Sequence, residues 1–348
     1  MISNPHADSL EPPLGPAADA WILLRRGPKN SIRSESAYAF LREWEPAPTA
    51  GSLVDVWTVF LTNRECPWRC LMCDLWKNTL DQAIEPGAIP RQLERALQAL
   101  AIHPPGSHPM PSVSERHLKL YNSGSFFDRQ AIPQADHVAI AQQAAGFARV
   151  IVECHPSLVG ERVLRFRDDL AGASQAAVAP GLELALGLET AHEASLERLN
   201  KRMTVSDFSK AARFLQQNAI ALRVFLLVHP PFIPIAEQEA WIHRSIDLAF
   251  DSGASVVSLI PTRVGNGALD ALRDAGLFRE PTLRELEAAF EYGLSLRRGR
   301  VLADLWDLER FSKCGLCFGP RRDRIERMNG TQVLEARVRC EKDCDSDA

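Results

Sequence analysis

Long hydrophobic runs are absent from this 348-residue sequence. No stretch comes near the roughly 18 uninterrupted apolar residues of a membrane-spanning helix. No basic segment followed by an apolar one stands at the start of the chain, as it would in a secretory signal. We therefore expect a cytoplasmic protein without a membrane partner.

An excess of charge of either sign is also absent. The 40 Lys and Arg residues face 44 Asp and Glu residues, and the net charge is −4. This balance argues against a protein whose whole surface attracts nucleic acid, although a local basic patch is compatible with it. With 46% hydrophobic and 24% charged residues, the composition is that of a globular protein.

Cysteines are few, eight in all, and they are unevenly placed. In a cytoplasmic protein, clustered thiols are better explained as metal ligands than as a disulfide framework. Two clusters stand on either side of a lone Cys154, and their members are Cys66, Cys70 and Cys73, and then Cys314, Cys317, Cys340 and Cys344.

The chain divides into four parts by its patterning. Residues 1–18 are rich in Pro, Ser and Ala without periodicity, which predicts a disordered tail. Residues 19–53 form an N-terminal extension, in which 35–45 have the pattern of a short helix. Residues 54–305 alternate apolar runs with helical patterns, and 306–348 are expected to form a small, separate metal-binding module.

Six apolar runs in the third part predict β-strands, and segments of helical periodicity separate them. Repeated βα units form parallel sheets. The sequence therefore predicts an α/β protein: a partial (β/α)6 TIM-like barrel with a small C-terminal metal-binding module that carries four cysteines. The predicted strands are 54–61, 117–122, 147–154, 182–188, 221–228 and 255–260.

The first cysteine cluster follows directly on the first predicted strand, at the mouth where barrel active sites are built. Thiolates are the usual ligands of iron-sulfur clusters, and three of them leave a fourth iron open to another molecule. The alternatives are a zinc site that lacks its fourth ligand, or three incidental thiols. Neither alternative explains the spacing of Cys66, Cys70 and Cys73 at a strand end.

This CxxxCxxC spacing resembles the radical S-adenosylmethionine (SAM) superfamily. The resemblance implies a 4Fe-4S cluster on Cys66, Cys70 and Cys73, with SAM bound to the open iron. It further implies reductive cleavage of SAM, a 5'-deoxyadenosyl radical that abstracts hydrogen from a substrate, and an external one-electron donor such as flavodoxin or ferredoxin.

Residues at the ends of later strands are candidates for holding SAM. Small residues at a strand end allow the backbone to approach a ligand, and a carboxylate or a cation at a barrel mouth can bind hydroxyls or a carboxylate. The alternatives are an ordinary turn and a helix cap. In the superfamily the corresponding positions hold SAM, which makes the expected contacts Ser123, Gly124, Ser125, Glu153, Glu189 and Lys201.

Two residues are candidates for the chemical step. Cys154 ends the third strand and could donate a hydrogen atom, although a lone cysteine is more often a small buried hydrophobe. Asp304 stands next to Trp306 near the mouth, where a carboxylate beside an aromatic ring could form a ligand wall. A capped helix start with a buried Trp explains the second pair equally well.

Several segments together resemble one branch of the superfamily: NRECPWRCLMCDLW, KLYNSGSFFD, GLET with LNKRM, and FLLVHPPF. They are similar to the radical SAM subunit of archaeosine synthase and its bacterial relatives, a group akin to the Elongator-type radical SAM domain. The resemblance implies a tRNA-modifying lyase that acts on a deazaguanine-type nucleoside. Two alternatives stay open: a radical SAM enzyme that acts on a free small metabolite, and a non-catalytic iron-sulfur or zinc protein that binds RNA.

The second cysteine cluster consists of two short hooks whose spacing is typical of a zinc ribbon. Structural zinc is the first interpretation, and an auxiliary iron-sulfur cluster is the rival. Arginines beside the hooks could bind RNA phosphates, or they could be paired with neighbouring carboxylates on a solvated helix face. These arginines are Arg321, Arg322, Arg324, Arg327, Arg337 and Arg339.

Overall fold

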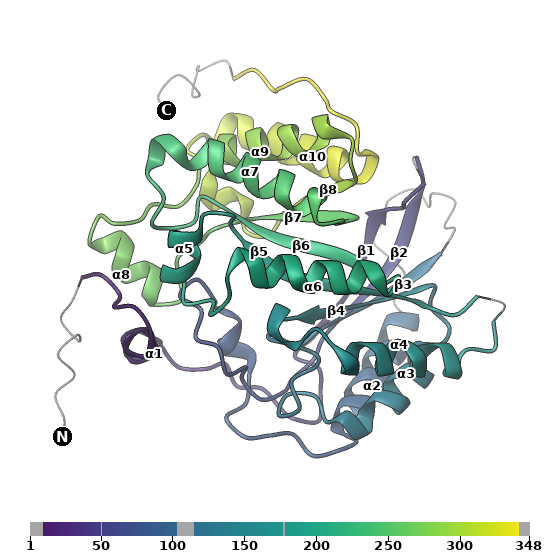
Figure 1. Cartoon of the computed structure of the whole chain (residues 1–348). Helices are drawn as coiled ribbons and strands as arrows, with labels where there is room; N and C mark the ends of the chain where they lie inside the picture. Colours follow the sequence, from purple (N-terminus) through teal and green to yellow (C-terminus); the bar gives the residue numbers. More distant parts are fainter. Residues whose placement is uncertain (1–9, 50, 103–114, 177, 341–348) are drawn as a thin grey trace, which may run out of the picture.

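The structure, a computed structural model, describes residues 10–49, 51–102, 115–176 and 178–340. Within them, eight strands form one sheet in chain order, β1 to β8 (Figure 1). Strand β1 runs antiparallel to β2, and every later neighbour is parallel to the strand before it. The strands are β1 (Ala39–Pro46), β2 (Leu53–Phe60), β3 (Arg116–Tyr121), β4 (Arg149–Cys154), β5 (Gly181–Glu189), β6 (Ala221–Val228), β7 (Val256–Pro261) and β8 (Arg300–Ala303).

Amphipathic helices connect the parallel strands and pack on the outside of the sheet (Figure 1). In α6, for example, Phe208, Ala211, Ala212 and Leu215 are buried, and this i, i+3, i+4, i+7 spacing places them on one face. The helices are α1 (Pro16–Leu23), α2 (Ala88–Ile102), α3 (His137–Ala144), α4 (Glu161–Ala173), α5 (Glu193–Arg198), α6 (Val205–Gln217), α7 (Gln238–Asp251), α8 (Ala268–Asp274), α9 (Leu283–Leu296) and α10 (Gly315–Thr331).

The predicted α/β barrel-like fold is confirmed, because all six expected strands occur within a residue or two of the predicted positions. The structure adds a strand at each edge of the sheet. Strand β8 forms from an apolar run after the sixth predicted strand. The prediction of a helix over 35–45 was wrong, since residues 39–46 form β1 and pair along their whole length with β2. Tertiary pairing here overrides a weak local helical preference.

The N-terminal stretch is better ordered than a tail, at least from residue 10 onward. Helix α1 begins at Pro16, inside the segment expected to be disordered, and Glu11 forms an ion pair with Arg198 at 2.6 Å. Trp21 and Ile22 are buried in a hydrophobic cluster that also contains Leu71 of the cysteine loop. Packing against that loop gives the segment the apolar burial that its own sequence pattern does not reveal.

The C-terminal helix is part of the barrel rather than of a separate module. Ile325 and Met328 of α10 belong to the main hydrophobic core. Their helix lies against both β1 and β8, whose facing edges form no ladder with each other in the described residues. Thus α10 covers the open side of the barrel.

Side chains at the end of α10 also form hydrogen bonds with the backbone N–H and C=O groups at the free edge of β8. The Asn329 carboxamide accepts from the N–H and donates to the C=O of Ala303, both at 2.8 Å. Gln332 does the same for Val301, at 2.8 and 2.9 Å. Two carboxamides thereby take the place of a neighbouring strand, which protects an edge that could otherwise pair with another chain.

Within the described ranges, no helix combines the length and the apolar character that crossing a membrane requires.

Candidate active site

A cavity of about 2220 Å³ opens at the C-terminal ends of the strands and continues into the barrel. It brings together residues predicted from segments far apart in the sequence. Ser125 is the exception, because it lies behind the cavity wall, where its hydroxyl accepts a hydrogen bond from the backbone of His155 at 3.3 Å. The predicted residues that line the cavity are Cys66, Cys70, Cys73, Ser123, Gly124, Glu153, Cys154, Glu189, Lys201 and Asp304.

The cysteine loop after β2 is held from two sides. The N–H of Leu71 donates to the carbonyl of Leu199 at 2.9 Å. The buried amide of Asn266 donates to the carbonyls of Leu71 and Cys73 at 2.7 and 3.3 Å. Asn200 adds a bond from its amide to the carbonyl of Arg69 at 2.8 Å. Groups of the protein itself therefore hold the loop backbone, although no sequence pattern had pointed to the two asparagines.

The three thiols of this loop suit a cluster better than a single ion. Burial raises the pKa of Cys66 to about 12 and raises the pKa of Cys70 and Cys73 as well. Thiols of this kind lose their protons when a metal binds to the sulfur. Among the described residues, the three sulfurs do not all lie within 4.8 Å of one another, as the ligands of one ion would. Wider spacing around an open cavity fits thiolates on separate irons.

Trp68, between the first two cysteines of the loop, stacks on the ring of His155 with 4.0 Å between ring centroids and 13° between planes. The His155 ring is fixed in turn by Ser157 at 2.7 Å and by the carbonyl of Lys201 at 3.0 Å. Burial lowers the pKa of His155 to about 4, so the stack is neutral. This stack joins the cysteine loop to the end of β4 and, through Lys201, to the segment after α5, and sequence reasoning missed it.

The turn after β3 approaches the cysteine loop so closely that only glycine fits. A Cβ added at Gly124 would lie 2.9 Å from the Cβ of Cys66. The preceding Ser123 has a left-handed φ of 54°, and its hydroxyl lies 3.1 Å from that of Tyr38. A strained non-glycine residue at a cavity wall is a common mark of a binding site.

Glu153 organises this turn from the end of β4. Its carboxylate accepts from the N–H of Asn122 at 2.8 Å, and the N–H groups of Ser123 and Gly124 also favour its charged form. Burial outweighs these bonds and raises the pKa of Glu153 to about 7. The protein therefore positions a carboxyl group that gains or loses its proton near neutral pH.

We expect this carboxyl group to affect stability in a defined pH window. The pKa of Glu153 rises from an ordinary 4.5 to about 7 on folding, so the folded chain binds the proton more tightly and stability falls as pH rises through that interval. A Glu153→Gln variant has no such proton to lose. Between pH 4.5 and 8, the free energy of unfolding in urea should fall for the wild type relative to the variant, by roughly 3 kcal/mol at most. A difference between the two proteins that does not change with pH would contradict the expectation.

The end of β5 carries an ion pair on strained backbone. Glu189 has a left-handed φ of 66° beside a register shift between Gly187 and Glu189. Its carboxylate accepts from Lys201 at 2.6 Å, and both side chains are nearly buried. Burial opposes the charge of Lys201, but Glu189 outweighs it and raises the pKa of Lys201. The positive charge of Lys201 is therefore retained at the cavity wall.

Gly187 makes room for this pair. A Cβ at Gly187 would lie 2.2 Å from a Glu189 oxygen and 2.6 Å from the Lys201 nitrogen. Because β5 also contributes the small Ala185 to the wall, the barrel interior stays open below the pair. A packed barrel would fill this space with large branched side chains.

Aromatic rings line the middle of the cavity. Phe60 and Tyr121 are 6.1 Å apart between ring centroids, at 68°, and Tyr121 is 6.1 Å from Phe225 across the barrel, at 84°. Neither the hydroxyl of Tyr121 nor that of Ser258 has a protein hydrogen-bond partner within the described ranges, and both residues line the cavity. The wall can thus offer ring faces and two neutral hydroxyls to a ligand.

The floor of the cavity is ionic and internally paired. Lys119 lies 2.7 Å from Glu43 and 2.5 Å from Glu45. Arg223 donates to Glu45 at 2.7 and 2.9 Å and to Glu183 at 2.8 Å. These bonds close the barrel at the end opposite to the cysteine loop.

The two candidates for the chemical step both line the cavity. Cys154 is only 4% exposed and donates to the carbonyl of His155 at 3.2 Å, which agrees with a buried small side chain. Asp304 is paired with Arg263, a cavity residue that the sequence did not single out. Trp306 is exposed, so the alternative of a buried Trp at this place was wrong.

The arginines near the C-terminus are largely paired with carboxylates. Arg321 and Arg324 are buried and bind Glu287, which removes them from any RNA-facing surface. Three of the exposed members have partners as well, in agreement with the alternative of a paired helix face. These pairs are Arg322 with Asp323, Arg327 with Glu335, and Arg337 with Glu291.

The barrel-like fold with a cysteine loop at its mouth resembles the radical SAM class. The chain is 28% identical over 238 residues to archaeosine synthase subunit beta of Methanosarcina acetivorans, covering 65% of this chain and 63% of that protein. It is 24% identical over 223 residues to an uncharacterised protein of Methanocaldococcus jannaschii, covering 61% and 57%.

The chain therefore spans less than two thirds of the length of these curated relatives. No family model matches the sequence. Among solved structures, it is similar to methylornithine synthase, with 14% identity and a TM-score of 0.47 over 83% of this chain and 77% of that one.

Proposed function

We propose that this chain cleaves SAM reductively and uses the 5'-deoxyadenosyl radical to abstract a hydrogen atom from a substrate. One observation carries the proposal: the cysteine loop after β2 and the ends of β3, β4 and β5 meet in a single cavity. In the radical SAM class, the same strand ends hold the cluster and SAM.

Cys66, Cys70 and Cys73 would hold the cluster. A 4Fe-4S cluster bound by three thiolates supplies an open iron for SAM and the electron for its cleavage. Backbone and asparagine bonds hold the loop that carries these thiols. An external donor such as flavodoxin or ferredoxin would provide the electron.

The strand ends would hold SAM by its polar groups. The turn at Ser123 and Gly124, with the carboxyl of Glu153 behind it, suits the SAM amino group. Glu189 can accept from ribose hydroxyls, and Lys201 can pair with the methionine carboxylate. Because Glu189 and Lys201 neutralise each other at 2.6 Å, neither charge is left unpaired in the absence of SAM.

The substrate would enter the part of the cavity below SAM. The volume of about 2220 Å³ exceeds the 300–1,000 Å³ or so of ordinary ligand pockets, which leaves room for a second molecule. The rings of Phe60, Tyr121 and Phe225 favour a planar aromatic group, because aromatic pairs are stabilised by stacked and edge-to-face contacts. A deazaguanine-type nucleoside in tRNA meets this requirement, and the similarity to an archaeosine synthase subunit favours it.

Product analysis tests the proposal. The anaerobically reconstituted protein is given SAM and a chemical reductant, with bulk tRNA, with free 7-deazaguanosine, or with neither. Formation of 5'-deoxyadenosine supports the enzyme, and its stimulation by tRNA alone supports the RNA substrate. Stimulation by the free nucleoside alone favours a small-metabolite enzyme. If no 5'-deoxyadenosine forms under any condition, the proposed reaction is wrong and the alternative of a non-catalytic metal protein is favoured.

A further inference from the structure

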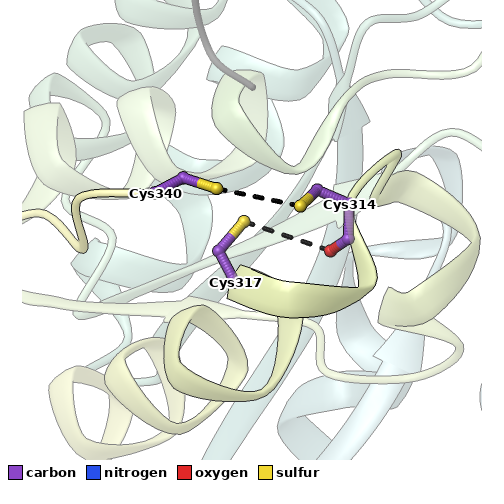
Figure 2. Close-up of side chains that lie close together, drawn as sticks. All are labelled: Cys314, Cys317 and Cys340. Carbon is purple, nitrogen blue, oxygen red and sulfur yellow. Dashed lines mark hydrogen bonds between the residues drawn. The ribbon is translucent and has the colours of Figure 1, made fainter. Parts of the chain in front are cut away.

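Three cysteines from the two ends of the C-terminal segment meet at the start of α10 (Figure 2). Cys314 is the N-cap of α10, Cys317 lies in its first turn, and Cys340 comes from the extended chain that follows the helix. All three sulfurs lie within 4.8 Å of one another. In the described part of the chain, no other group of Cys, His, Asp and Glu side chains meets this criterion.

Their spacing matches the ligands of one tetrahedral ion. With Zn–S bonds near 2.3 Å, two thiolates on a tetrahedral zinc are about 3.8 Å apart, and the sulfurs of Cys314 and Cys340 are 3.8 Å apart. Thiolates on different irons of a cluster are separated by the iron core. The distances therefore favour a mononuclear site. Cys344, the fourth cysteine of the cluster expected from the sequence, lies outside the described residues.

The site closes a strap over α10. We define the strap as residues 332–340, which leave the end of the helix and return along it to the helix start (Figure 1). Arg324 donates to the carbonyl of Glu335, Arg327 binds the Glu335 carboxylate at 2.8 Å, and Arg337 binds Glu291 at 2.6 Å. The strap forms no helix or strand, and exposed ion pairs stabilise weakly.

The strap covers α10, and this helix is part of the barrel wall. Helix α10 closes the open side between β1 and β8, and its residues Asp323, Asn329 and Thr331 line the large cavity. Asn329 and Gln332 fix the end of the helix on β8. The cysteines fix its beginning to the strap, so both ends of this wall are held.

We propose that Cys314, Cys317 and Cys340 bind one zinc ion that clamps the strap onto α10 and thereby holds the open side of the barrel shut. The thiols release their protons to water as the metal binds. The ion has a structural role, because the three cysteines lie outside the lining of the large cavity and join the strap to the start of α10.

Metal analysis of the full-length, iron-reconstituted protein tests the clamp. We expect about one zinc per chain besides the iron, and its loss in Cys317→Ser and in Cys340→Ser. Cys154→Ser is the matched control, since this buried thiol lies outside the group, and it should keep the zinc. If about eight irons per chain are found without zinc, the cysteines bind a second iron-sulfur cluster and the zinc clamp is wrong. If no zinc and no additional iron is found, the cysteines form no metal site.

Proteolysis then tests what the metal does. Without zinc, trypsin should cleave after Arg337 and Arg339 of the strap about ten-fold faster, because local unfolding exposes the chain. A zinc chelator applied to the wild type should give the same acceleration and zinc should reverse it, which keeps the test valid if a serine variant folds poorly. Zinc loss without faster cleavage would overturn the clamp. None of these readouts depends on SAM cleavage, so the proposed function can fail or hold independently.

Discussion

A Cys70→Ala variant is expected to lose its iron and with it the formation of 5'-deoxyadenosine, by about a thousand-fold or more. Cys70 is the middle thiol of the loop and is buried against the cavity. Two remaining thiolates cannot fix a cluster at the strand end. The loop backbone has its own bonds to Leu199 and Asn266, so the fold should survive the change.

Iron content and the visible thiolate-to-iron absorption measure the first effect, and product analysis measures the second. Cys154→Ala is the matched control for iron content, because it removes a buried thiol from the same cavity without touching the loop. If Cys70→Ala keeps its iron and still forms 5'-deoxyadenosine, the assignment of the cluster to this loop is wrong.

The parallel core of the fold was predictable because each of its strands is a continuous apolar run followed by a helical pattern. Strand β1 was not predicted because its sequence, AFLREWEP, mixes charged and apolar residues as an exposed helix does. In the structure, Glu45 is buried and binds Arg223 and Lys119 inside the barrel, and Glu43 also binds Lys119. Pairing with β2 and ion pairs with the cations of β3 and β6 reveal this, and local patterning cannot.

The cysteine loop and the strand ends of the site were predictable from spacing, since parallel strands place their carboxyl ends at one mouth. The residues that hold the loop were not. Asn200, Asn266 and the stacked pair of Trp68 and His155 act through backbone carbonyls and ring contacts. Such contacts leave no repeated pattern in one sequence.

The ionic floor did leave a signal. Each of the buried strands β3, β5 and β6 carries one charged residue near the middle of an apolar run: Lys119, Glu183 and Arg223. Charged side chains are rarely buried without a partner. Opposite charges in neighbouring buried strands could therefore have predicted that these side chains meet inside the barrel.

Arg223→Ala is expected to reduce the free energy of unfolding by about 3–5 kcal/mol, the usual cost of breaking a buried ion pair. Arg223 is 2% exposed and binds the carboxylates of Glu45 and Glu183, which are 5% and 0% exposed. Its removal leaves Glu183 with the longer ion pair to Arg149, at 3.5 Å, while Glu45 keeps Lys119 at 2.5 Å. Denaturant unfolding measures the loss.

The pH dependence of that loss separates charge from packing. Burial raises the pKa of Glu45 and Glu183, but Arg223 outweighs it and holds both below the ordinary value of 4.5. The stability from these pairs is therefore complete above pH 4.5 and is lost as pH falls below it. The difference in unfolding free energy between wild type and Arg223→Ala should shrink in that range.

Arg298→Ala, which breaks an exposed pair with Asp251, is the matched control and should cost at most about 1 kcal/mol. A loss for Arg223→Ala that is equally small at neutral pH, or that does not shrink on acidification, would show that the floor is not held by charge.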